Sequence, residues 1–229
     1  MDSQADLRSQ IKGLLVSKSN LKQQVFDNTF NLFAELKDVL HEFSTELDEE
    51  LDDKIDKRIR IDYIDKGKSE ARLQVAADML VFAMHTNVFT FEKEHRIWHN
   101  QYVQTDRANS YCGVINIYNF LADSFKNKRA DDEGYLIARI FVNREGMFFV
   151  EGKRQERWRV DEFGRERISR EAILEILQRA ILYALGFDLL MPSYDSIKRV
   201  NVEQFDSRSE NTQFQTGKRL GYEFLADDI

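Results

Sequence analysis

The first part of the chain has the hydrophobic periodicity of a long amphipathic helix. Apolar residues recur at steps of three, four or seven over residues 4–43, namely Leu7, Ile11, Leu14, Leu21, Val25, Leu32, Leu36, Val39 and Phe43. A second row broadens this stripe, formed by Leu15, Phe26, Phe30, Phe33 and Leu40. A stripe this wide indicates a helix face that packs on other elements, rather than the narrow seam of a two-stranded coil. The polar stretch 17–20 predicts an interruption, after which Asn20 and Gln23 form a capping pair that restarts the helix.

The next segment, residues 44–57, is rich in Asp and Glu but keeps a thin apolar edge. Leu47, Leu51 and Ile55 continue the four-residue step between the acids. These acids lack the glycine and the alternating spacing of a calcium-binding loop, so a solvated helix face explains them better than a cation site. We therefore expect a helical region over residues 1–57.

Residues 58–229 are expected to form an α+β domain with a mainly antiparallel sheet. Alternation of Ile59, Ile61 and Tyr63 predicts a short strand. Ser69 is placed to cap a helix, and residues 79–84 either end that helix or form a buried strand. Tyr111 to Tyr118 is a stronger strand candidate.

The second half of this domain contains its clearest local unit. Residues 135–142 and 147–151 are rich in strand formers and flank a four-residue turn that contains Gly146, which predicts a β-hairpin. Residues 158–160 suggest a further strand. Ser169 predicts the cap of a broadly apolar helix that ends at Gly186, and residues 220–224 alternate as a last strand.

Composition excludes several classes of protein. The 229 residues are 42% hydrophobic and 12% aromatic, so a chain that is disordered throughout is excluded. A net charge of −7 does not favour nucleic acid as a partner of the whole surface, although a local basic cleft is compatible with it. The single cysteine, Cys112, rules out an internal disulfide and a Cys-rich zinc module. With no signal-like N-terminus and no long apolar run, we expect a cytoplasmic protein without a membrane span.

The end of the predicted hairpin has the one motif that suggests chemistry. An apolar strand leads into Glu151-Gly152-Lys153, which resembles the core of the PD-(D/E)xK nucleases. The resemblance implies that Glu151 and an upstream acid, Asp132 or one of its neighbours Asp131 and Glu133, hold a divalent Mg or Mn ion while Lys153 positions or activates the attacking water. The family's Pro-Asp pair is missing. Folding the hairpin about its turn pairs Glu151 with Ala138, which leaves Asp132 beyond the strand edge, so a structural charge pair is the competing interpretation.

The histidines and the basic residues give weaker signals. His95 and His99 are four residues apart, as two metal ligands on one helix face would be, but the HExxH pattern is absent and hydrogen-bonded structural roles are favoured. Basic residues gather at 126–129 and at 153–170. The second group includes Trp158, which fits either a nucleic-acid patch with stacking aromatics or, as we prefer, a mixed-charge strand edge.

Two functional hypotheses follow from these patterns. In the leading one, the N-terminal stripe binds a protein partner or a second copy of the chain, and the protein is a non-enzymatic interaction or assembly subunit of a bacterial cytosolic complex. In the alternative, it is a metal-dependent nuclease centred on Glu151 and Lys153. The first hypothesis depends on whether the stripe is covered by the chain's own sheet.

Overall fold

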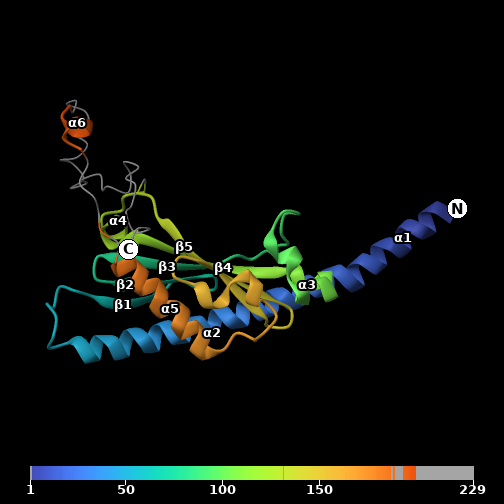
Figure 1. The fold of residues 1–229 in the computed structure, drawn as a ribbon, viewed down its shortest axis with the longest axis horizontal. Helices are drawn as coiled ribbons and strands as arrows, with labels where there is room; N and C mark the ends of the chain where they lie inside the picture. Colours follow the sequence, from blue (N-terminus) through green and yellow to red (C-terminus); the bar gives the residue numbers. More distant parts are fainter. Residues whose placement is uncertain (1, 131, 187, 189–192, 200–229) are drawn as a thin grey trace.

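The N-terminal region is one long helical rod. The computed structural model describes residues 2–130, 132–186, 188 and 193–199. Helix α1 (Asp2–Leu14) continues through a π-helical turn, η1 (Leu15–Ser19), into α2 (Asn20–Leu51), as Figure 1 shows. The predicted interruption is thus a change in helical winding. The predicted capping pair is wrong, because Ser19 and Asn20 both have helical backbone angles.

The rod ends at Leu51, earlier than the predicted residue 57. Its last turn contains no basic residue and is followed directly by Asp52 and Asp53. Negative charge at a helix C-terminus opposes the helix dipole, which accounts for the early end.

The sheet is an antiparallel meander in which each strand pairs with its neighbour in sequence. An α+β fold with an antiparallel sheet is therefore confirmed. The strands are β1 (Ile61–Asp65), β2 (Glu70–Val75), β3 (Asp78–Met84), β4 (Cys112–Leu121), β5 (Tyr135–Asn143) and β6 (Phe148–Gly152).

The helix predicted after Ser69 is wrong, and the strand alternative for residues 79–84 is correct. Strands β2 and β3 form a hairpin in which Leu73 pairs with Leu80. Their turn is tight, and Ala76 adopts a φ of 55° there. Burial decides the outcome, because alternate residues of β2 face one packed layer, whereas a helical stripe would leave them on several sides.

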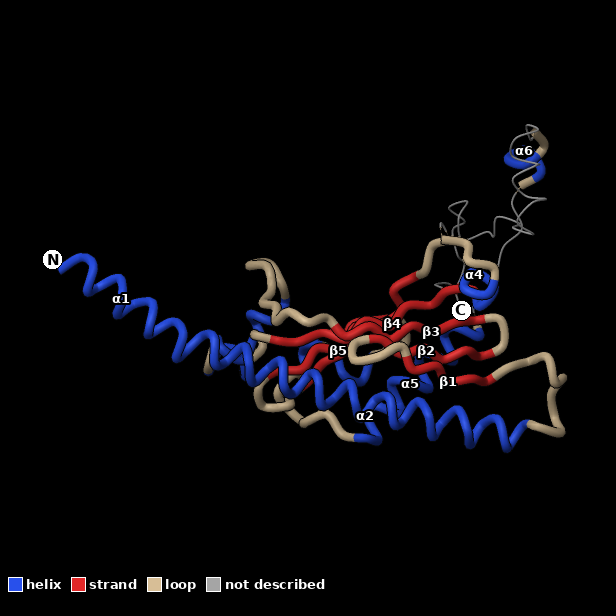
Figure 2. Tube along the Cα trace, turned by 180° about the vertical axis from the view of Figure 1, so that it is seen from behind, coloured by secondary structure: helices blue, strands red, loops and turns tan. Residues whose placement is uncertain are grey.

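Helices α2 and α5 (Arg170–Leu185) cover one face of the sheet, as the views in Figures 1 and 2 show. Between them lies the main core, whose largest fully buried members include Phe33, Leu40, Phe82, Ile115 and Ile173. The prediction for α5 is confirmed: the Ser169 hydroxyl accepts a hydrogen bond from the Ala172 N–H at 3.3 Å, and Gly186 follows the last turn.

The opposite face is covered at the β4–β6 end by short helices and turns. These are η2 (Arg96–His99), α3 (Gln101–Thr105), η3 (Arg107–Ser110), η4 (Glu156–Trp158) and η5 (Val160–Glu162). They enclose a second apolar cluster that includes Ile97, Cys112, Phe149 and Phe163. The strand predicted at 158–160 is wrong, because these residues belong to 3-10 turns.

Two short helices complete the described chain, α4 (Ala122–Lys126) after β4 and α6 (Tyr194–Ile197). The strand predicted at residues 220–224 lies outside the described residues. Within those residues, no helix is both long and apolar enough to cross a membrane.

Candidate functional site

The N-terminal stripe divides into a buried part and an exposed part. From Val25 onward most of its apolar residues are buried in the core of the chain itself or packed against it, and Leu32, Leu36 and Leu40 are buried against the sheet and α5, whereas Phe30 stays 38% exposed. Leu21, just before that point, is half-buried. The part of the stripe before Leu21 is uncovered, and its four large apolar side chains are 56–59% exposed, namely Leu7, Ile11, Leu14 and Leu15. Val16 is 70% exposed but lies outside the stripe.

We call residues 6–17 the N-terminal arm. Figures 1 and 2 show α1 projecting past the end of the sheet. Within the described chain, the hydrogen bonds of its side chains stay inside the arm, from Gln10 to Asp6 at 2.9 Å and from Ser17 to the Gly13 carbonyl at 2.7 Å. Just after the arm, Lys18 Nζ lies 5.9 Å from the centre of the Tyr111 ring in the body. The arm is thus an amphipathic helix with an uncovered apolar face.

Polar contacts anchor α2 beside the arm. The Asn28 side-chain amide donates to the carbonyls of Asn143 at 3.1 Å and Arg144 at 2.6 Å, in the turn between β5 and β6. Thr29 is buried against Gly113 of β4. A rigid attachment at α2 holds the direction of the arm relative to the sheet.

The predicted nuclease residues occupy separate surroundings. The β5–β6 hairpin forms, and Glu151 pairs with Arg139, one residue from the expected partner, because Gly146 (φ 74°) closes a three-residue turn. The Asp132 side chain is buried, forms an ion pair with Arg129 at 2.8 Å and accepts a hydrogen bond from Ser124 Oγ at 2.6 Å.

Asp132 and Glu151 lie far apart along the direction of strand β5. Asp132 precedes Tyr135, the first residue of β5, and Arg139 lies four residues farther along, a distance of about 13 Å at the rise of a strand. Lys153 is exposed after β6. The structure therefore does not bring Asp132 to Glu151, and Asp131 lies outside the described residues.

Glu151 instead lies between two nitrogen donors. One carboxylate oxygen accepts a hydrogen bond from Arg139, and the other is 3.1 Å from His95 Nε2. His95 Nδ1 accepts a hydrogen bond from the Ile97 N–H at 3.1 Å, which places the imidazole proton on Nε2 and makes it the donor to Glu151. The sequence gives no local signal of this association, because His95 and Glu151 are 56 positions apart.

The histidines do not share a helix face. His95 has extended backbone and caps the 3-10 turn η2, which ends at His99. Both ring nitrogens of His95 are engaged, as described above. Across the described residues, no three His, Cys, Asp or Glu side chains are arranged to hold a metal ion.

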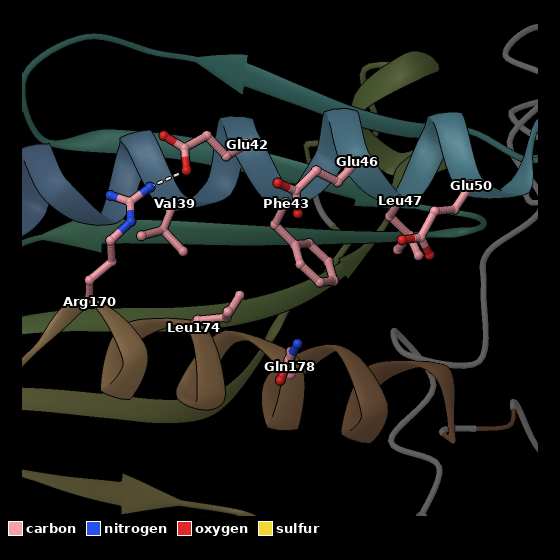
Figure 3. A pocket seen from close by; sticks show the side chains of 9 residues that line it. All are labelled: Val39, Glu42, Phe43, Glu46, Leu47, Glu50, Arg170, Leu174 and Gln178. Atoms are coloured by element: carbon pink, nitrogen blue, oxygen red, sulfur yellow. Dashed lines mark hydrogen bonds and ion pairs between the residues drawn. The ribbon is translucent and has the colours of Figure 1, made fainter.

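One hollow of the structure lies beside Glu151, and another lies beside helix α2. One, of about 660 Å³, lies over Phe91, His95 and Glu151. The other, of about 410 Å³, lies between α2 and α5, with Phe43 and Leu174 at its base (Figure 3). Acidic side chains of α2 line the second hollow, and the ion pair of Glu42 with Arg170 spans it.

Comparison of the chain with protein-family models, with curated proteins and with solved structures finds no match. Arguments about function therefore start from the geometry of the arm and of the sheet.

Proposed function

We propose that the protein is a non-enzymatic assembly subunit that pairs with a second copy of itself through the N-terminal arm. The observation that carries this proposal is the exposure of four large apolar side chains on one helix face. Contiguous apolar surface of this kind marks interaction sites on proteins. The arm projects from the body, so a second helix can reach its apolar face.

The apolar area is sufficient for a reversible dimer. Full burial of a Leu or Ile side chain contributes about 1.5–3 kcal/mol, and since these side chains are 56–59% exposed, each can still contribute about 1–2 kcal/mol. Eight such side chains from two arms together contribute about 8–16 kcal/mol. Association costs about 4–15 kcal/mol, so the net free energy of pairing is at most about 12 kcal/mol, a range that includes the roughly 8 kcal/mol of a micromolar dissociation constant.

The charges of the arm favour an antiparallel pair. Asp6 is near its start, whereas Arg8, Lys12 and Lys18 follow toward the body. A parallel pair would place each of these cations beside its own copy, which is unfavourable. An antiparallel pair brings Asp6 of one chain toward the basic part of the other.

The test compares the association of the wild type with that of the I11Q/L14Q double variant by sedimentation equilibrium. We expect a concentration-dependent dimer for the wild type. Removing four of the eight apolar side chains costs about 4–8 kcal/mol, which weakens the dimer about a thousandfold or more and leaves a monomer at micromolar concentration.

The S9Q variant is the matched control, because it changes an exposed polar residue of the same helix and should leave the dimer intact. The substituted side chains do not contribute to the core. The far-UV circular dichroism and melting temperature of the double variant should therefore match those of the wild type at a concentration at which the wild type is monomeric. A wild type that stays monomeric at 100 µM, a concentration about a hundredfold above the expected dissociation constant, would contradict the proposal.

Nothing in the described structure favours the nuclease alternative at Glu151 and Lys153, which stays a prediction. Membership of a bacterial cytosolic complex likewise stays a prediction.

A further inference from the structure

A basic groove lies on the open face of the sheet at the end opposite the arm. It has a volume of about 1030 Å³ and extends over the outer surface of β1–β3 to α4, where the Ala122 N–H bonds to the Ala77 carbonyl at 2.8 Å. Figures 1 and 2 place α4 and α1 at opposite ends of the molecule. The groove is lined by six cationic side chains, Arg58, Arg60, Lys66, Arg72, Lys126 and Arg129, and by one carboxylate, that of Asp123.

The excess of positive charge in the groove contrasts with the negative net charge of the whole protein. The chain has a net charge of −7, so a groove with six cations and one acid is a local reversal of sign. The cations come from separate parts of the chain, the 58–66 segment, β2 and α4, which only the fold brings together. Such a concentration of positive charge attracts an anionic ligand and orients its approach.

Three of these cations already have carboxylate partners. Arg58 pairs with Asp56 at 2.8 Å, Arg72 with Glu70 at 2.6 Å, and Arg129 with Asp132 at 2.8 Å.

The other three are available to a ligand. Within the described part of the chain, Arg60, Lys66 and Lys126 have no ion pair, and all three side chains are exposed. The protein does not neutralise these three charges. Arg60 and Lys66 belong to one wall of the groove, and Lys126 belongs to the other. A ligand that contacts all three must therefore carry several negative charges along its length.

Aromatic rings accompany these charges. The guanidinium of Arg72 lies 4.2 Å from the centre of the Phe125 ring, within cation–π distance. The Phe125 ring packs edge-on against Phe120 at 5.3 Å, and Phe120 neighbours Tyr118 at 6.4 Å. All three rings are partly exposed. A planar group can stack on such rings or on a guanidinium plane.

We propose that this groove binds single-stranded nucleic acid. Arg60 and Lys66, at the two ends of β1 and about 20 Å apart at the rise of a strand, contact phosphates at separate points along the ligand, and Lys126 contacts a further one, while the Arg72–Phe125 pair stacks on a base. Single strands fit better than duplexes because only unpaired bases expose their faces to aromatic side chains. An acidic peptide supplies charge but no flat ring for the stacked pair. The inference stands independently of the arm, since the two features lie at opposite ends.

The experiment measures binding of fluorescein-labelled 12-mers of oligo(U) and oligo(dT) to the full chain by fluorescence anisotropy at 50–200 mM salt. We expect binding that weakens as salt increases. The K66Q/K126Q variant should bind at least tenfold more weakly, and its slope of log affinity against log salt should fall by about 1.4, as expected when two phosphate contacts to a single strand are lost.

Two further variants separate charge from stacking. F125L keeps every charge and should weaken binding about 5–100-fold without changing the salt slope. K93Q/R159Q removes the same charge from exposed side chains outside the groove and should bind as the wild type does. Circular dichroism checks that each variant is folded.

Three results would overturn the proposal. The first is no binding by the wild type at 50 mM salt. The second is equal loss of affinity in K66Q/K126Q and K93Q/R159Q, which would indicate attraction by overall charge alone. The third is competition by polyglutamate or by a 12-base-pair duplex as effective as that by the unlabelled single strand, which would assign the groove to acidic peptides or to duplexes.

Discussion

Adding one methyl group at Gly113 tests whether α2 is seated on the sheet. Gly113 lies in β4 directly beneath the buried Thr29 of α2. A Cβ built at this position would lie 1.9 Å from Thr29 Oγ1 and 2.8 Å from both its Cβ and its Cγ2. Ordinary contacts are longer by more than half an ångström, so G113A forces the helix and the strand apart.

The free-energy cost of G113A depends on whether the Thr29 side chain can move to relieve the clash. Rotating Thr29 would relieve the shortest contact but would break its hydrogen bond to the Val25 carbonyl at 2.7 Å, and the contact with its Cβ would remain. Overpacking of this kind costs about 1–3 kcal/mol. Replacing a glycine in a strand returns about 0.5–1 kcal/mol, which leaves a net loss of at most about 2.5 kcal/mol. Because the contact at 1.9 Å is severe, we expect the upper part of this range, so that G113A lowers the free energy of unfolding by about 1–2 kcal/mol.

Urea denaturation followed by circular dichroism at 222 nm measures this change. In a double-mutant cycle, T29A removes two of the three clashing atoms, so G113A should be less damaging in the T29A background by at least about 0.5 kcal/mol. The control is G13A, which adds the same methyl group to the same helical rod where no atom lies within 4 Å, and which should not destabilise the protein. An unchanged urea midpoint for G113A, with no coupling to T29A, would refute the seating of α2 described above.

Two further predictions concern buried polar groups. Asn143 is fully buried, and its side-chain oxygen accepts hydrogen bonds from the N–H groups of Glu145 (2.9 Å) and Met147 (3.1 Å). N143A should therefore lower the free energy of unfolding by about 2–3 kcal/mol in the same urea assay. A loss below about 0.5 kcal/mol would contradict this role. Burial raises the pKa of the Cys112 thiol, which should therefore not react with Ellman's reagent at pH 8 in the native protein but should titrate as one thiol in 6 M guanidinium; rapid native labelling would show that the second cluster is open.

Local patterns predicted the elements whose signals lie close together in sequence. The β5–β6 hairpin and α5 have their turn and cap residues within or beside the element, and both form as expected. The helix expected after Ser69 failed because the apolar residues of 71–84 fit both a helical and a strand spacing. Packing of alternate residues against α2 and α5 selected the strands.

For the candidate sites too, local sequence signals predicted single residues, whereas their partners were decided by the tertiary structure. Glu151 was recognised as an acid at a strand end, but its partners Arg139 and His95 are 12 and 56 residues away in sequence. The sequence does not predict the basic groove. Lys126 lies in a basic segment, but the other wall comes from residues 58–72, whose local patterns indicate a strand, a turn and a helix. Charges in separate segments form a surface only after the strands pair.

The sequence by itself determined that the N-terminal region is a long amphipathic helix with a wide apolar stripe, because helical periodicity is a local property. It did not determine where that stripe stops being core. The same spacing runs from Leu7 to Phe43, yet only the part from Val25 onward lies over the sheet. Tertiary structure decided this, because burial depends on the length of the sheet beneath the helix, and that length is set by strand pairings far along the chain.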